Sequence, residues 1–261
     1  MYSSAKQKIL KTKVNKNPFP FLFIKDLISK KDLNSLNNVL PNYDSIIKDE
    51  VLYQSSSRTK ASVLPKSITY KQLNKSREFK KINSLFNKLK PVIVKKFENY
   101  INLYVEKKSS IDSLKYHSLY AVMKKGYIKS PHIDRRDHLI HILFYPSSDP
   151  TKGGEICLHE LKSKKKVFDV FPSKKSLKIK KKYKVYNNSC LIVLNVPWAY
   201  HSVSMYKSLV DRKYLYMVYD FPISKSGSII KNRKAGFNEN QFWKNEVKVK
   251  SLQRKKVFLT E

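Results

Sequence analysis

A histidine and an aspartate stand two residues apart, directly before a strongly apolar stretch, in the segment SPHIDRRDHLIHILFY at residues 130–145. In extended backbone, side chains two positions apart point to the same side, so His132 and Asp134 can offer an imidazole nitrogen and a carboxylate oxygen to one point. Zinc and iron both accept these donor atoms. Two ligands hold a metal weakly, and the candidate third ligand is His201, in the segment WAYHSV. The sequence therefore predicts a metal site built from His132, Asp134 and His201.

These residues lie in a part of the chain whose apolar residues recur with a period of two, which is typical of β-strands. Eight candidate strands cover residues 116–124, 139–145, 155–161, 166–171, 177–185, 190–195, 200–204 and 214–221. Turn-forming residues separate several of them, and no helical pattern intervenes, so we expect a double-sheet jelly roll or barrel. His138 and His141 are three apart in one of these strands and are expected to face opposite sides.

The first hundred residues show a different pattern. Residues 1–17 are rich in lysine and aperiodic, which predicts a loosely docked terminus. Residues 19–27 form a candidate strand, and Ser29 with Asp32 provides a capping signal for the helix that follows. Residues 51–67 are expected to be mainly loop with one short strand. Apolar residues recur every three or four positions over residues 79–104, which predicts a helix that is kinked or divided at Pro91.

We expect one domain overall, mainly β with flanking helices around a jelly-roll core. Residues 1–115 would contribute an N-terminal strand and helices that pack on the barrel, and residues 116–222 would form the catalytic core. Residues 223–261 would form a C-terminal extension, with a candidate helix at 238–252. A length of 261 residues with 41% apolar content is sufficient for one large domain of this kind.

The composition gives further expectations. Two cysteines, Cys157 and Cys190, argue against a disulfide scaffold and favour a reducing compartment. The apolar run at residues 19–24 is too short to span a bilayer, which predicts a cytoplasmic protein without a transmembrane segment. A formal charge of +34 attracts polyanions such as nucleic acid or anionic lipid. Drift toward lysine and asparagine codons would produce the same excess, so charge alone does not identify a partner.

The order of these motifs resembles the Fe(II)/2-oxoglutarate-dependent dioxygenase superfamily, in its prolyl-4-hydroxylase-like branch. The resemblance covers residues 116–222 by motif and implies that His132, Asp134 and His201 are the three iron ligands. Gly126 and Pro131 match positions before the first histidine, and the Gly-Gly-Glu segment at residues 153–155 matches a turn after the next strand.

The same resemblance implies a cosubstrate site. Arg212, eleven residues after His201, matches the base that binds the distal carboxylate of 2-oxoglutarate, and Tyr145 matches a tyrosine that contacts the same group. Met123 stands near a position where many relatives have a tyrosine, and we expect Tyr120 to serve instead. An arginine suits this role because its planar fork matches a carboxylate and stays charged when buried.

The resemblance therefore implies a hydroxylase that consumes 2-oxoglutarate and dioxygen, releases succinate and CO2, and acts on an unidentified primary substrate. Its cofactors would be Fe(II), with 2-oxoglutarate as cosubstrate and ascorbate as a candidate reductant. Two alternatives remain open. One is a polyanion-binding protein that uses the lysine-rich block at residues 162–184 on a jelly-roll scaffold. The other is a cupin-type metal enzyme without 2-oxoglutarate, against which the position of Arg212 argues.

Overall fold

The computed structural model describes residues 1–48, 52–54, 58–101, 114–134, 138–162, 172, 174–196 and 198–220. The helices in these residues are α1 (Tyr2–Lys11), α2 (Lys30–Val39), α3 (Tyr43–Ile46), α4 (Ile68–Leu73), α5 (Arg77–Lys96), α6 (Glu98–Ile101) and the 3-10 helix η1 (Lys174–Ser176). The strands are β1 (Phe21–Ile24), β2 (Leu52–Gln54), β3 (Lys60–Val63), β4 (Lys115–Met123), β5 (Lys129–His132), β6 (His138–Ser147), β7 (Ile156–Leu161), β8 (Leu177–Tyr183), β9 (Ser189–Leu194), β10 (His201–Val203) and β11 (Arg212–Asp220).

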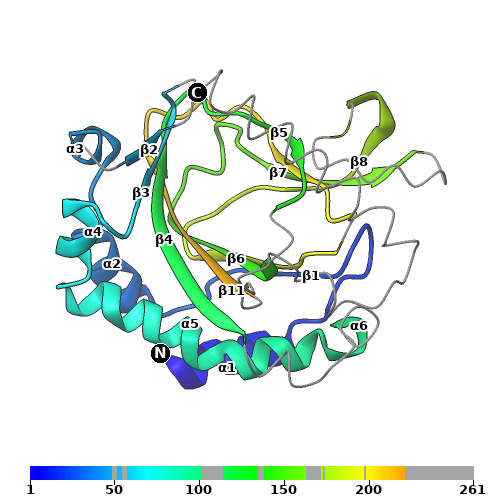
Figure 1. The fold of residues 1–261 in the computed structure, drawn as a ribbon, viewed down its shortest axis with the longest axis horizontal. Helices are drawn as coiled ribbons and strands as arrows, with labels where there is room; N and C mark the ends of the chain where they lie inside the picture. The colour runs from blue at the N-terminus through cyan, green and yellow to red at the C-terminus, as the bar shows by residue number, and fades with distance from the viewer. Residues whose placement is uncertain are drawn as a thin grey trace, which may run out of the picture.

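The strands form two antiparallel sheets that face each other (Figure 1). The larger sheet has the order β1-β9-β6-β11-β4-β3-β2, and the smaller has the order β5-β10-β7-β8. From β4 to β11 the chain crosses repeatedly between them: β4, β6, β9 and β11 lie in the larger sheet, and β5, β7, β8 and β10 lie in the smaller one. Eight strands crossing in this way form a double-sheet jelly roll, as predicted, and β1, β2 and β3 extend its larger sheet.

Seven of the eight predicted strands are present, as β4 and β6 to β11. The remaining one, at residues 166–171, lies outside the described residues, as does the candidate helix at 238–252. Residues 51–67 contribute two strands, β2 and β3, where one was expected. Periodicity missed β5, because its sequence Lys-Ser-Pro-His has no apolar alternation. Pairing with β10 organises this short strand, so its conformation depends on tertiary contacts.

Helices cover the outer face of the larger sheet (Figure 1). The α5 residues that face the sheet or neighbouring helices are Phe79, Ile82, Leu85, Phe86, Leu89 and Ile93, all of them buried. The ring centroid of Phe86 lies 5.9 Å from that of Phe144 in β6, and its carbonyl accepts a 2.7 Å hydrogen bond from Tyr219 in β11. This packing uses the outward side chains of β6 and β11. The alternate side chains of the same strands therefore point into the space between the sheets.

The helix ends follow the sequence signals in part. Ser29 caps α2 as predicted, because its hydroxyl accepts a 3.1 Å hydrogen bond from the Asp32 amide. The predicted division of the later helix also occurs, but not at Pro91. Helix α5 continues through Pro91, and α6 begins only after Phe97, whose φ of −102° ends the α-helical backbone.

The prediction of a loosely docked N-terminus is wrong. Residues Tyr2–Lys11 form α1, whose Ala5 and Ile9 are fully buried against the core. These two residues are four positions apart and share one helical face. Helix α1 packs beside α5 (Figure 1), so it belongs to the helical layer behind the larger sheet. No helix in the described part of the chain is long and apolar enough to cross a membrane.

Candidate metal centre and carboxylate pocket

The smaller sheet brings the two predicted histidine ligands together. His132 ends β5 and His201 begins β10, and the antiparallel pairing of these strands places the two residues directly opposite each other. Asp134 follows β5 after one residue. The His132 Nε2 atom lies 3.5 Å from Asp134 Oδ1, and the His201 Nε2 atom lies 3.8 Å from Asp134 Oδ2. Ligand atoms at right angles around one metal at ~2.1 Å are about 3 Å apart, so a small inward movement would complete a site.

Both imidazoles are oriented for metal binding. The Nδ1–H group of His132 donates to the Ser130 carbonyl at 2.9 Å, and that of His201 donates to the Ala199 carbonyl at 3.0 Å. Each Nε2 atom therefore keeps its lone pair and faces Asp134. Backbone partners of this kind fix the tautomer and the ring plane of histidine ligands. The ligand atoms of His132, Asp134 and His201 all lie within 4.8 Å of one another.

The electrostatics of the centre favour the forms that bind a cation. Burial lowers the pKa of His201 to about 3, with a smaller contribution from His132, so the imidazole is neutral at physiological pH. Burial by itself would raise the pKa of Asp134, but the interactions with the neighbouring histidines, chiefly His141, lower that pKa well below its usual range. The centre thus presents a neutral His201 imidazole and the Asp134 carboxylate beside His132, and two imidazoles with one carboxylate fit the donor set of Fe(II).

A further histidine, His141 in β6, also contacts Asp134. Its Nδ1–H group donates to Asp134 Oδ2, the same oxygen that accepts a 3.1 Å hydrogen bond from the Tyr216 hydroxyl. His138 Nδ1 lies 2.9 Å from the Tyr216 oxygen. Because the single hydroxyl proton of Tyr216 is directed at Asp134, His138 must be the donor in this contact. Sequence reasoning missed these contacts.

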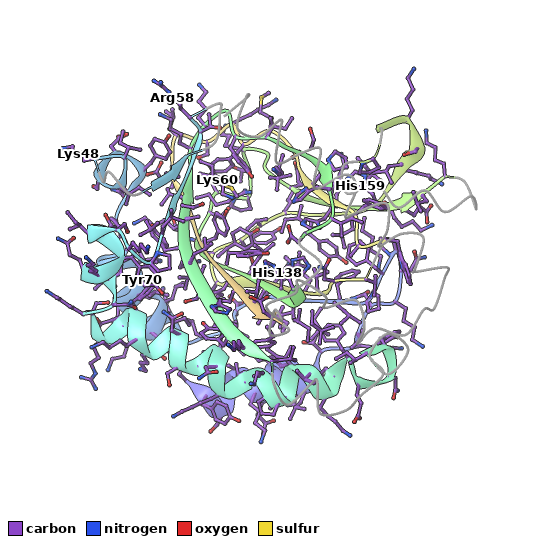
Figure 2. The ribbon with its side chains drawn as sticks, viewed as in Figure 1. Lys48, Arg58, Lys60, Tyr70, His138 and His159 are labelled. Carbon is purple, nitrogen blue, oxygen red and sulfur yellow. The ribbon has the colours of Figure 1, made fainter. Side chains whose placement is uncertain are left out.

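The expectation that His138 and His141 face opposite sides is wrong. The pairing of β6 with β11 is irregular at this point: Ile140 pairs with Tyr219, but Asp220 pairs with His138, which leaves one residue of β6 without a partner. Such a bulge interrupts the alternation of side chains, so residues three apart can share a face. The two imidazole centroids are 6.4 Å apart, and Figure 2 shows His138 at the start of β6, with His159 on the opposing sheet.

Arg212 is a fully buried cation on the inner face of β11. Its Nε atom donates to Ser148 Oγ at 2.8 Å, and its Nη1 atom donates to the Gly154 carbonyl at 2.5 Å. A longer contact of 3.4 Å joins Nη2 to the Gly153 carbonyl. No carboxylate of the described residues is within ion-pair distance of Arg212. These neutral contacts hold the guanidinium in place without an ion pair to a described residue.

Aromatic rings surround this cation. The Arg212 Cζ atom lies 4.3 Å from the ring centroid of Tyr206 and 5.9 Å from that of Tyr145, which stacks on Tyr214 at 5.7 Å. Burial lowers the pKa of Arg212, but an arginine remains charged in such surroundings. The Lys60 ammonium lies 5.7 Å from the Tyr214 ring and brings a second positive charge toward this wall (Figure 2). The surroundings of Arg212 are therefore aromatic and positively charged.

The structure does not place Tyr120 on the inner face of the sheet beside Arg212. On β4, Tyr120 pairs with Leu215, an outward-facing residue of β11, and its hydroxyl donates to the Pro41 carbonyl at 2.5 Å. Met123 pairs directly with Arg212 and lies on the inner face. Side chains three positions apart in a regular strand point to opposite faces. This alternation already indicated from the sequence that Tyr120 and Met123 cannot face the same site.

The metal centre and Arg212 both lie between the two sheets, and Tyr216 of β11 links them through its contact with Asp134. Tyr216, which contacts Asp134, is four residues after Arg212 on β11, a Cα separation of about 13 Å at the usual rise of a strand. Both side chains point into the space between the sheets. His132 and His201 thus face this space from the smaller sheet, with Asp134 next to β5, whereas Arg212 and Tyr145 face it from the larger sheet.

Comparisons with known proteins bear on the fold. No family model and no curated protein sequence matches the chain. A prolyl-4-hydroxylase from Pseudomonas putida is similar with a TM-score of 0.50 and 10% identity, over 85% of this chain and 100% of that chain. The non-heme alpha ketoglutarate dependent epimerase SnoN from nogalamycin biosynthesis gives a TM-score of 0.50 and 9% identity, over 84% of this chain and 83% of that chain. The predicted fold is confirmed: the chain has the jelly-roll fold of the 2-oxoglutarate-dependent oxygenases.

Proposed function

We propose that this chain is an Fe(II)- and 2-oxoglutarate-dependent dioxygenase that hydroxylates its primary substrate. The observation that carries the proposal is the presence of two complementary sites between the two sheets. One is the cluster of His132, Asp134 and His201, and the other is Arg212, a buried cation without a carboxylate partner among the described residues. A metal and a dicarboxylate together satisfy both sites.

His132, Asp134 and His201 would hold the metal through one carboxylate and two neutral imidazoles. Three protein ligands leave about three of the six positions that Fe(II) prefers, which suffices for a chelating keto acid and dioxygen. When bound, the iron and cosubstrate supply the oxidising power for C–H hydroxylation, with succinate and CO2 as products. The protein supplies ligand geometry and a shielded site.

Arg212 would bind the distal carboxylate of 2-oxoglutarate. Its Nε–H and one N–H of each terminal nitrogen contact Ser148 and two glycine carbonyls, and the remaining terminal N–H groups are available for an incoming anion. Tyr145 would line the same pocket. Burial raises the pKa of the Tyr145 hydroxyl, which therefore stays protonated and can donate a hydrogen bond to the carboxylate. A cupin-type enzyme without 2-oxoglutarate gives no reason for a buried arginine here.

The primary substrate is not encoded by these features. The two similar structures are named as a prolyl-4-hydroxylase and as an epimerase, and they share one fold despite different reactions. One fold thus supports more than one reaction and more than one substrate.

The test is turnover of 2-oxoglutarate to succinate with Fe(II) and ascorbate, in wild type and two variants. His132→Ala should abolish turnover and metal binding, because it removes one of three ligands. Arg212→Met keeps the volume of the side chain and removes its charge, so it should raise the KM for 2-oxoglutarate at least 100-fold while Mn(II) binding is retained. Lys125→Ala, an exposed basic residue, is the matched control and should leave both measurements unchanged.

If metal-loaded wild type neither binds 2-oxoglutarate nor produces succinate, the proposed function is wrong. Equal KM values in Arg212→Met and wild type would remove Arg212 from the cosubstrate site. Circular dichroism of each variant separates these results from misfolding.

A further inference from the structure

The two carboxylate oxygens of Asp134 have different surroundings. Oδ1 lies 3.5 Å from the Nε2 atom of His132, and Oδ2 lies 3.8 Å from the Nε2 atom of His201. Oδ2 accepts hydrogen bonds from two buried donors, the Nδ1–H group of His141 and the hydroxyl of Tyr216. A carboxylate oxygen has two lone pairs in its plane, so two donors occupy both of them. Oδ1 is then the oxygen that remains free to bind a metal.

The two donors are held firmly in position. His141 lies in β6 and Tyr216 in the neighbouring β11, and both point into the space between the sheets. His141 is 2% exposed. His138 donates to the oxygen of Tyr216 at 2.9 Å, which directs the only hydroxyl proton toward Asp134.

His141 is not placed as a metal ligand itself. Its Nδ1 atom is the one that faces Asp134, and its Nε2 atom, on the far edge of the ring, is buried without a hydrogen-bond partner. His132 and His201 instead present Nε2 to Asp134 and donate Nδ1–H to backbone carbonyls. The ring of His141 thus has the reverse orientation from the rings of the two histidine ligands.

We propose that His141 and Tyr216 are positioning residues that make Asp134 bind the metal through Oδ1 alone. The inference rests on the proposed function, because it concerns the same metal centre. A carboxylate that bound through both oxygens would occupy one more coordination position and leave fewer for the cosubstrate and dioxygen. By retaining Oδ2, the two donors keep three positions open.

The test measures Co(II) affinity of the full chain by calorimetry, together with the visible absorption of bound Co(II). His141→Leu and Tyr216→Phe should each weaken Co(II) binding 10–100-fold, the range typical when a partner of a ligand is removed. Both should also change the absorption, because a released Oδ2 alters the coordination. His141→Asn keeps an N–H donor near the position of Nδ1 and should restore affinity to within about threefold of wild type.

Tyr219→Phe is the matched control. Tyr219 lies on the same strand, and its buried hydroxyl donates to the Phe86 carbonyl on the opposite face. The Tyr219→Phe variant loses one buried hydrogen bond, as Tyr216→Phe does. It should nevertheless leave the affinity for Co(II) and the absorption of bound Co(II) unchanged. A merely structural role for Tyr216 predicts the same result for both variants.

The experiment distinguishes failure of the proposed metal centre from failure of the positioning inference. If wild type binds no Co(II), or if His132→Ala does not weaken binding, the proposed metal centre itself is wrong. If wild type binds and both His141→Leu and Tyr216→Phe match Tyr219→Phe, the positioning inference alone is overturned. Loss of binding in His141→Asn as complete as in His132→Ala would identify His141 as a ligand and also overturn it.

Discussion

The Arg212 guanidinium occupies its observed position because residue 154 is a glycine and has no side chain. A Cβ atom there would lie 2.5 and 2.6 Å from the two terminal nitrogens of Arg212 and 2.7 Å from Cδ2 of Tyr206. These distances are far below van der Waals contact, and the φ of +71° also disfavours other residues. Glycine therefore allows the guanidinium to approach the backbone and donate to the Gly154 carbonyl. The Gly-Gly-Glu segment noted in the sequence thus has a physical role beside Arg212.

We expect Gly154→Ala to weaken 2-oxoglutarate binding at least tenfold in the Mn(II)-loaded protein, because the new methyl group displaces the guanidinium. Mn(II) affinity should remain unchanged. Gly126→Ala is the control: its φ is +93°, so it carries similar backbone strain, but its Cβ would meet only Thr59 Cγ2, at 3.3 Å. Calorimetric titration with 2-oxoglutarate checks this prediction, and equal affinities for the two variants would contradict it.

The candidate site could be predicted from sequence where residue type and spacing carried the information. His132 and Asp134 stand at strand spacing, and their convergence with His201 needs only that two strands pair. The contacts of His141 and Tyr216 could not be predicted, because they depend on a bulge in β6 that leaves no mark in the apolar pattern.

At the scale of elements, the long strands were predictable and the shortest was not. Strands such as β6 and β9 bury nearly every residue and read as apolar runs. By contrast, β5 has two exposed residues among four and forms through its pairing with β10. Helix α1 was missed for a related reason: Ala5 and Ile9 are a weak apolar signal among many lysines. The structure shows that these two residues suffice to bury one helical face.

We expect Ile9→Ala to lower the free energy of unfolding by about 2–4 kcal/mol, because it removes a fully buried side chain and leaves a cavity. The neighbouring Leu10 is 48% exposed, so Leu10→Ala should change the stability by less than about 0.5 kcal/mol. Urea denaturation of both variants measures the difference. If the two substitutions have the same effect, α1 does not contribute its buried face to the folded core.

At the scale of the whole molecule, the net charge of +34 and the candidate site in the interior support different functional hypotheses. Among the described lysines of β8, Lys178 and Lys180 are near Glu160, at 3.7 and 3.3 Å, and exposed pairs of this kind contribute little to stability. The polyanion hypothesis depends on the electrostatic field of such residues, whereas the proposed reaction depends on Arg212 and the proposed metal centre. A strongly positive surface also attracts a dianion such as 2-oxoglutarate, so its association rate should fall as salt rises.

Binding of Mn(II) and of 2-oxoglutarate should stabilise the whole fold, because each ligand is expected to bind only the folded chain. A ligand at 100 times its Kd adds about 2.7 kcal/mol, which corresponds to a rise in Tm of about 5–10 °C for a protein of this size. We expect Mn(II) to raise the Tm and 2-oxoglutarate to raise it further. Arg212→Met should keep the first increment and lose the second, whereas His132→Ala should lose both, since the cosubstrate chelates the metal. Differential scanning calorimetry measures the increments. A full 2-oxoglutarate increment in Arg212→Met would show that the cosubstrate binds elsewhere.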